Sequence, residues 1–284
     1  MATTASDPYA MRDPRTQYPQ PDFPKQPQPA PGLASDMVPR PDHGETSYRG
    51  NGRLKDRKAL VTGGDSGIGR AAAIAFAREG ASVVINYLPS EQKDADEVIA
   101  LLTGEGHKVV GIPGDLKDES FCNDLIAKTV KELGGLDLLA NVAGRQQFAN
   151  TIAELDSKAF EETFQTNVFA LFWLCKAALP HMPPGAAIVN TASIQAYDPS
   201  AILLDYAPTK AAIVAFTKAL SEQAAEKGIR VNAVAPGPVW TPLQPSGGQP
   251  QEKLVEFGKN VPLKRPGQPV ECAPVYVLLA SQEA

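Results

Sequence analysis

The chain has 284 residues, of which 43% are hydrophobic and 21% are charged, and its net charge is −5 at pH 7. This composition supports the core of one large domain or two small ones and excludes disorder throughout. The acidic balance gives no general attraction to nucleic acid or anionic lipid, so we expect neither as a partner.

No segment predicts export, a membrane span or a metal site. Residues 1–20 carry charges and prolines where a secretory signal would be apolar, and the longest apolar run, 168–175, is too short to cross a bilayer. The three cysteines are odd in number and widely spaced, which predicts buried, reduced thiols: Cys122, Cys175 and Cys272. The three histidines are equally scattered, so we expect no metal. Because neither export nor disulfide bonds are predicted, we expect a cytoplasmic protein.

Residues 1–50 hold 10 of the 26 prolines and show no helical or strand periodicity. We expect a proline-rich extension there, followed by one catalytic domain over 51–284. Tyrosine and phenylalanine residues within the extension are unusual for a solvated linker. Two interpretations stay open: an unstructured tail, or a segment that packs on its own domain or on a neighbouring subunit.

From residue 58 onward, short β-branched runs alternate with amphipathic stretches, which predicts repeated βα units. Strands are expected at 58–62, 82–87, 108–112, 136–142, 186–192 and 230–235. Helices are expected near 67–80, 91–104, 118–133, 156–181, 206–227 and 268–281. Because the strand segments are almost wholly apolar, both faces of the sheet should be covered, as in a doubly wound parallel α/β fold.

The turn after the first predicted strand is rich in glycine. Gly63, Gly67 and Gly69 follow the spacing G-x-x-x-G-x-G. Asp65, Ser66 and Ile68 lie between these glycines. A turn without bulky side chains lets the backbone approach a pyrophosphate, and the following helix offers free N–H groups. The Walker loop of an ATPase would need a G-K-[ST] ending, so the strand–turn–helix context predicts a dinucleotide site.

Tyr206 and Lys210 lie four residues apart at the start of a predicted helix, so both side chains project from one face. Ser193 follows the fifth predicted strand at the sheet edge where open α/β folds bind ligands. A nearby ammonium favours the phenolate, which suits the tyrosine to proton transfer, and the serine hydroxyl can bind the substrate oxygen. Asn167 stands among apolar neighbours in a predicted helix, which indicates an amide drawn into the interior.

These residues resemble the short-chain dehydrogenase/reductase family in its compact single-domain form, over about residues 54–284. The match comprises the glycine loop and the segment 141–144, which corresponds to the family's Asn-Asn-Ala-Gly motif with one departure. It also includes the catalytic tetrad of the family, Asn167, Ser193, Tyr206 and Lys210. The bacterial branch with an N-terminal extension, described as glucose/ribitol dehydrogenase-like or aldehyde reductase-like, is especially similar. The resemblance implies a Rossmann-type fold, an NAD(P)-dependent oxidoreductase and a homotetramer.

By this resemblance, Tyr206 is the general acid/base, Lys210 binds the nicotinamide ribose and tunes the tyrosine, and Ser193 orients the substrate. Asn167 is implied to hold a water that links Lys210 to solvent. Asp115 is implied to bind the adenine. The other implied cofactor contacts are Leu116, Asn141, Ala143, Gly144, Pro236, Gly237, Val239 and Thr241.

Two departures from the family pattern stand out. Val142 replaces the second asparagine of the 141–144 motif, and we expect a packing change there without loss of activity. Family members usually end on a seventh strand, which the sequence up to Ala284 lacks. Either the sequence given is truncated or one sheet edge is unpaired, which would weaken the usual tetramer contact.

The choice between NAD and NADP normally depends on an acid at the end of the second strand. Tyr87 and Leu88 occupy that place, so nothing there repels a 2′-phosphate, although no basic residue selects it either. We expect NADP in preference to NAD, with dual use open.

The stretch 240–266 is expected to close the substrate pocket. No cationic cluster stands out, which favours a small neutral alcohol or carbonyl compound. Gln146, Gln195, Tyr197 and Leu243 are the expected pocket residues. Two rival functions stay open. A nucleotide-sugar epimerase or dehydratase is disfavoured by the glycine spacing and by the lack of a larger C-terminal domain. A non-catalytic cofactor sensor is disfavoured by the complete tetrad.

Overall fold

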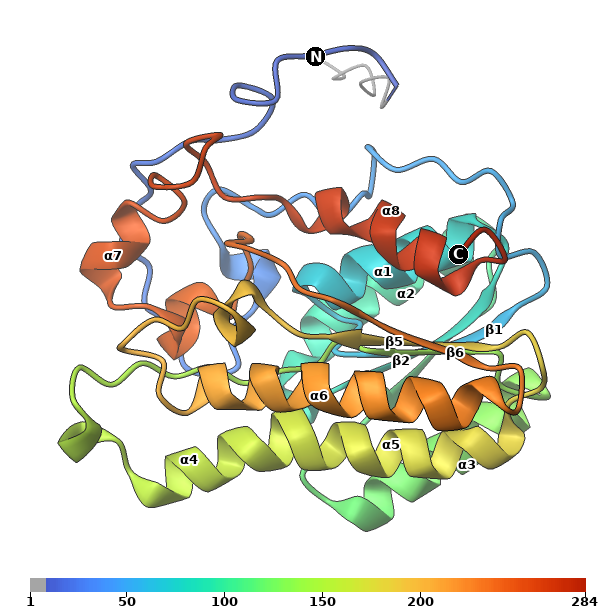
Figure 1. Cartoon of the computed structure of the whole chain (residues 1–284). Coiled ribbons are helices and arrows are strands. Elements are labelled where there is room, and N and C mark those ends of the chain that lie inside the picture. The colour runs from blue at the N-terminus through green and yellow to red at the C-terminus, as the bar shows by residue number, and fades with distance from the viewer. Residues whose placement is uncertain (1–8) are drawn as a thin grey trace.

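Six short strands form a parallel sheet in the computed structural model, which describes residues 9–284 (Figure 1). Their order across the sheet is β3-β2-β1-β4-β5-β6, and every neighbouring pair is parallel. The strands are β1 (Lys58–Thr62), β2 (Ser82–Tyr87), β3 (Val109–Pro113), β4 (Leu138–Asn141), β5 (Ala187–Thr191) and β6 (Arg230–Val234). The predicted doubly wound fold is confirmed, and the predicted strand ends are correct to within two residues.

Helices cover both faces of the sheet, above and below it in Figure 1. On one face lie α1 (Gly67–Arg78), α2 (Gln92–Gly104) and α8 (Pro269–Ala280). On the other lie α3 (Glu119–Leu133), α5 (Ala170–Ala178) and α6 (Tyr206–Ala225). The helix α4 (Ser157–Phe164) precedes α5 in the chain and leads into it. The central strands are buried on both sides, which is why their sequences are continuously apolar instead of alternating.

The helix predicted at 156–181 is not regular. It is interrupted by a π-helical turn, Gln165–Phe169, between α4 and α5, and it ends in a 3₁₀ turn, Leu179–His181. Apolar periodicity cannot reveal one inserted residue in a helix, because the apolar face continues on both sides of it. Such π-helical turns occur frequently at functional sites.

The segment 240–258 is more ordered than its Pro, Gly and Gln content suggests. It contains a π-helical turn, Gln244–Gly248, and the short helix α7 (Gln251–Val255). We call 240–258 the substrate loop. It lies beside the N-terminal extension at the left of Figure 1.

Residues 18–50 of the extension pack along the domain of their own chain, whereas residues 9–17 are exposed. Phe23 and Met37 are buried in a small cluster with Trp240 and Leu254. Of the two interpretations left open by the sequence, the structure shows the packed segment for residues 18–50. The boundary between residues 50 and 51 stays a prediction.

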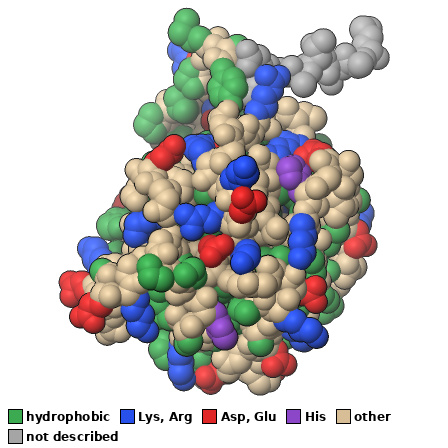
Figure 2. Space-filling model, turned by 90° about the vertical axis from the view of Figure 1, so that its right-hand side faces the viewer, with side chains coloured by type: hydrophobic (Ala, Val, Ile, Leu, Met, Phe, Trp, Pro, Cys, Tyr) green, Lys and Arg blue, Asp and Glu red, His purple; other side chains and the backbone are tan. Residues whose placement is uncertain are grey.

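The strand order reverses between β1 and β4, so the crevice of this fold lies beyond their carboxyl ends. Figure 2 shows the side of the molecule opposite this crevice, where basic and acidic side chains are interspersed.

Among the described residues, β6 pairs with β5 alone and forms one edge of the sheet. Within residues 9–284, no helix is both long and apolar enough to cross a membrane.

Candidate active site

A cavity of about 530 Å³ lies at the carboxyl edge of the sheet, where the strand order reverses. Its wall is built from the turns that follow the strands, and the substrate loop closes one side. This is the place where open α/β folds bind ligands. The volume falls in the range of cavities that hold small molecules and cofactors.

The glycine loop forms one wall of this cavity because it is folded too tightly for side chains. A Cβ on Gly69 would lie 1.9 Å from the carbonyl oxygen of Gly63. Gly63 has φ +62°, and a Cβ there would lie 3.0 Å from the Cα of Ala143. The hydroxyl of Thr62 accepts the backbone N–H groups of Val142 and Ala143 at 3.0 and 3.1 Å, which ties the loop to the end of β4.

Tyr206 and Lys210 lie in the first turns of α6 and are both buried in the cavity wall. The Nζ of Lys210 lies 5.3 Å from the centre of the Tyr206 ring and donates to the carbonyl of Thr191 at 2.8 Å. Burial lowers the pKa of Lys210 to about 8. Burial also raises the pKa of Tyr206 to about 12, while a hydrogen bond with the Ser193 hydroxyl acts in the opposite direction. The three side chains are therefore adjacent, as the sequence predicts.

Asn167 projects from the π-helical turn and is buried behind the cavity. Its Oδ1 accepts the N–H of Arg145 at 2.7 Å. Its Nδ2 donates to the carbonyl of Arg145 at 2.9 Å and to the hydroxyl of Thr209 at 3.0 Å. The amide thus joins α6 to the turn after β4, in which Gly144 lines the cavity.

The other end of the cavity is formed by the turns after β2 and β3. The amide of Asn86 donates to the carbonyls of Ile112 and Gly114, which fixes these turns relative to each other. Asp65 and Glu91 line this end, and burial raises the pKa of both carboxyl groups. Neither oxygen of the Asp65 carboxyl group has a hydrogen-bond partner among the described residues.

Most of the residues predicted as cofactor contacts lie in the cavity wall. They are Gly63, Asp65, Ser66, Gly67, Ile68, Gly69, Tyr87, Leu88, Asp115, Leu116, Ala143, Gly144, Tyr206, Lys210, Pro236, Gly237, Val239 and Thr241, and the predicted catalytic residue Ser193 lies in the same wall. Of the expected substrate contacts, Gln146, Gln195 and Leu243 are also part of the wall.

Two predicted residues are placed differently. Asn141 lies at the end of β4, but its amide donates to Asn190 of β5 and does not face the cavity. Tyr197 is 64% exposed and outside the wall. Asn167 lies in the interior behind the wall, as its apolar neighbours predict. A residue at a strand end projects either into the crevice or between strands and helices, and sequence position alone does not decide which.

The cavity wall also contains residues that sequence reasoning missed. Ala30 and Pro31 come from the extension, and Arg145 and Ser246 come from the turn after β4 and from the substrate loop. No local signal marks Ala30 and Pro31, because tertiary contacts place them, such as the hydrogen bond between Ser246 and Pro31, which are 215 positions apart. The position of Arg145 directly after Gly144 is a signal that could have been used.

The cavity fits a dinucleotide. The glycine turn offers backbone without side chains at the start of α1, and a buried phenol, ammonium and hydroxyl lie at the opposite end. No group of three His, Cys, Asp or Glu side chains in residues 9–284 is arranged to hold a metal ion. The arrangement suits proton transfer to or from an oxygen atom of a bound molecule.

Comparison with known proteins agrees with the geometry. Residues 63–284 match the family described as Enoyl-(Acyl carrier protein) reductase. The oxidoreductase YghA of Escherichia coli is 60% identical over 96% of this chain and 93% of its own length. NADPH-dependent aldehyde reductase 1, chloroplastic, of Arabidopsis thaliana is 46% identical over 88% of both chains.

A solved structure supports the same assignment. A short-chain dehydrogenase from Burkholderia cenocepacia, in complex with NADP, is 30% identical with a TM-score of 0.75, over 81% of this chain and 93% of that one. The chain described here therefore belongs to the short-chain dehydrogenase/reductase family, and it is an oxidoreductase. The predicted resemblance is confirmed.

Proposed function

We propose that the protein interconverts an alcohol and an aldehyde or ketone, using NADP or NAD and Tyr206 as general acid/base. The observation that carries this proposal is the buried triplet of Tyr206, Lys210 and Ser193 at the cavity wall. Buried titratable groups with shifted pKa values in a cleft are characteristic of catalytic sites.

In the direction of reduction, a nicotinamide held in this cavity would supply the hydride for the carbonyl carbon. The phenol of Tyr206 gives its proton to the carbonyl oxygen as that oxygen becomes an alcohol, and the Ser193 hydroxyl donates a hydrogen bond to the same oxygen. The ammonium of Lys210 stabilises the resulting phenolate through its charge. The Thr191 carbonyl holds this ammonium 5.3 Å from the ring centre of Tyr206, so its position is set before substrate binds.

The glycine loop would hold the pyrophosphate of the cofactor through the backbone of Gly67, Ile68 and Gly69. Lys210 and Tyr206 would contact the nicotinamide ribose, and Asp115 the adenine. We favour NADP, because Leu88 replaces the acid that repels a 2′-phosphate. The names of the Arabidopsis aldehyde reductase and of the Burkholderia complex support this preference.

The substrate is a small neutral aldehyde, ketone, sugar or polyol. Arg145 brings a cation to the cavity wall, but its guanidinium donates to the Thr163 hydroxyl at 2.7 Å and pairs with Glu162 at 3.2 Å. Because it is already paired, it does not call for an anionic substrate. Gln146, Gln195 and Leu243 offer amide and apolar contacts.

We further propose a cytoplasmic homotetramer. The surface of the α4–α5 segment supports association, since Phe160, Phe169 and Phe172 are between 37% and 47% exposed there. Large exposed apolar groups that gather on one surface are typical of protein–protein contacts.

A panel of neutral carbonyl compounds and polyols tests the reaction. Purified protein should oxidise NADPH, and NADH more slowly, with at least one small aldehyde, and reduce NADP with the matching alcohol. Anionic 2-oxo acids of similar size serve as the matched comparison and should react poorly. No turnover with any carbonyl compound or alcohol, despite tight NADPH binding, would refute the proposal and support a cofactor sensor.

A further inference from the structure

Residues 23–37, which we call the strap, run across the side of the active-site cavity. Ala30 and Pro31 are part of the cavity wall, although the family match covers only residues 63–284. The strap therefore contributes to the site itself. Its role follows from what holds each of its ends.

The first end of the strap is fixed to the substrate loop by an aromatic stack. Phe23 is 4% exposed, and its ring stacks on Trp240 with centroids 4.2 Å apart. The backbone N–H of Phe23 donates to the carbonyl of Val255 at 2.9 Å. The indole N–H of Trp240 donates to the carbonyl of Pro39, just beyond the strap, at 2.8 Å. The buried aromatic pair thus joins the extension to the first residue of the substrate loop.

Hydrogen bonds continue this contact to the cavity. The N–H of Gln26 donates to the side chain of Gln251 at 2.8 Å. The hydroxyl of Ser246 donates to the carbonyl of Pro31 at 2.9 Å, and both residues line the cavity. The strap and the substrate loop are therefore bonded along the length of the loop, from its start to α7.

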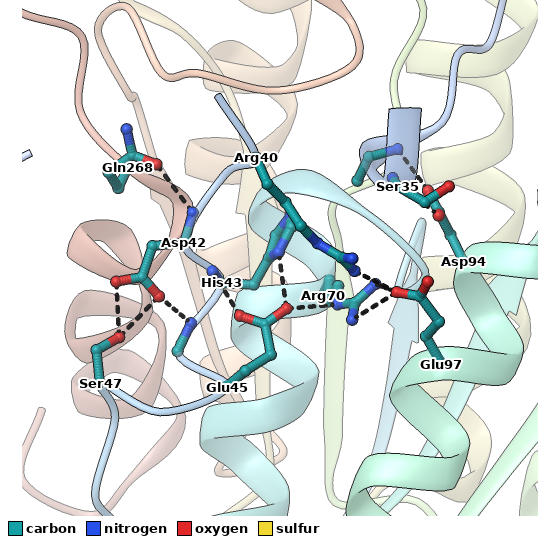
Figure 3. Close-up of polar contacts among 12 residues, drawn as sticks. Ser35, Arg40, Asp42, His43, Glu45, Ser47, Arg70, Asp94, Glu97 and Gln268 are labelled. Carbon is teal, nitrogen blue, oxygen red and sulfur yellow. Dashed lines mark hydrogen bonds and ion pairs between the residues drawn. The ribbon is translucent and has the colours of Figure 1, made fainter. Parts of the chain in front are cut away.

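The second end of the strap is fixed to α2. The carboxylate of Asp94, which is fully buried, accepts the backbone N–H groups of Ala34 and Ser35 at 2.5 and 3.1 Å. Figure 3 shows this contact at the right of the view. Two charge-assisted bonds to a buried carboxylate form a firm attachment.

The chain that follows the strap is fixed to the helix after the glycine loop. Arg70 of α1 is 2% exposed and pairs with Glu45 at 3.1 Å and with Glu97 of α2 at 3.3 Å. Arg40 pairs with the same Glu97 (Figure 3). Arg70 is thus engaged with the extension and absent from the cavity wall, and it is not placed to bind a 2′-phosphate.

We propose that the strap is a positioning element of the active site, which holds the substrate loop in its closed position before ligands bind and slows release of the cofactor. Loops that cover a site are commonly mobile and order only on binding. A loop already bonded to a fixed strap has less ordering entropy to lose, so binding is favoured by pre-organisation. The effect on cofactor release rests on the proposed function. The effect of the strap on the order of the substrate loop does not.

The test uses Phe23→Ala in the full chain, which removes the stack on Trp240 and leaves the cavity wall intact. Amide hydrogen exchange without cofactor should become at least about 10-fold faster in residues 240–258 and stay unchanged in β4 and β5. The rate of NADPH release, followed by fluorescence in stopped flow, should rise by a similar factor. Arg15→Ala is the matched control, because Arg15 is exposed, lies in the same extension and pairs with Asp13.

Two outcomes would overturn the proposal. One is wild-type exchange in residues 240–258 of the Phe23→Ala protein, together with a wild-type release rate. The other is faster exchange throughout the sheet, which would make the strap a general stabiliser of the fold. Hydrogen exchange needs neither substrate nor turnover, so it remains decisive even if no carbonyl compound is reduced. A protein that binds no NADPH would refute the proposed function. The exchange rates in residues 240–258 would then still test whether the strap orders the substrate loop.

Discussion

Lys210 carries an energetic cost that its proposed role explains. Burial lowers its pKa from 10.5 to about 8, so at neutral pH the folded state holds a buried ammonium, which donates a hydrogen bond to the Thr191 carbonyl. The stability that this group can contribute is present above pH 10.5 and lost as the pH falls to 8. A residue that costs stability yet lines the cavity is characteristic of a functional site.

Replacing this lysine should stabilise the protein. We expect Lys210→Met to raise the free energy of unfolding at pH 7.5 by about 1–2 kcal/mol, since the removed charge penalty exceeds the lost hydrogen bond. Between pH 8 and 10.5, wild type should gain up to about 3 kcal/mol relative to the variant. Urea unfolding at several pH values measures both effects. Lys218→Met, an exposed position on the same helix, is the control, and a pH-independent difference would contradict the account.

Asp65 and Glu91 should make the choice of cofactor depend on pH. Burial raises the pKa of both carboxyl groups, so they are largely neutral at low pH and become charged as the pH rises. A charge at this end of the cavity repels a 2′-phosphate more than a ribose hydroxyl.

The affinity for NADP relative to NAD should therefore fall about fivefold between pH 7 and 9 in wild type. In Asp65→Asn the decline should be smaller, because one of the two charges is absent. Fluorescence titration with NADPH and NADH gives the two dissociation constants. Asp96→Asn on the exposed face of α2 should behave like wild type. A ratio that stays constant with pH in wild type would show that the carboxyl groups do not face the 2′ position.

At the scale of elements, α8 supports the strand that carries the site. The hydroxyl of Tyr276 on α8 is hydrogen bonded to the Thr191 side chain at 2.7 Å, and the carbonyl of the same threonine binds Lys210. Both side chains are buried, so removal of one hydroxyl leaves the other without this partner.

Tyr276→Phe should accordingly lower the free energy of unfolding by about 1–2 kcal/mol. Thermal or urea unfolding detects this loss. Tyr197→Phe, which changes a tyrosine that is 64% exposed, should leave stability unchanged. Equal stability of the two variants would mean that the bond between α8 and β5 contributes nothing.

The elements also show what the sequence could and could not predict. Continuous apolar runs identified the strands, because a sheet covered on both faces has no polar side. The spacing of Tyr206 and Lys210 placed both side chains on one face of α6, since four residues complete about one helical turn. The π-helical turn at Asn167 left no periodic signal, and neither did the contact of Pro31 with Ser246, which joins segments 215 residues apart. Local pattern determines elements, whereas tertiary contacts of irregular segments depend on the whole fold.

At the scale of the molecule, the exposed aromatic side chains of the α4–α5 segment predict self-association. Phe172→Glu would place a charge in an apolar contact, so the variant should dissociate into smaller species. Light scattering after size-exclusion chromatography measures the mass. Ile152→Glu, at a 78% exposed position outside this segment, should keep the wild-type assembly. A wild-type mass for Phe172→Glu, or a monomeric wild type, would contradict the proposed tetramer interface.

The fold brings the glycine turn after β1 and the phenol of Tyr206 on α6 to one cavity, although nearly 140 residues separate Gly67 from Tyr206. The central claim is that Tyr206 supplies the proton of a nicotinamide-dependent reduction. The most direct measurement is kcat for NADPH-dependent aldehyde reduction by Tyr206→Phe, with the dissociation constant of NADPH measured alongside. We predict a kcat lower by about 10²–10⁴-fold with nearly unchanged NADPH affinity, because the variant loses only the phenolic hydroxyl. A kcat equal to that of wild type would contradict the claim.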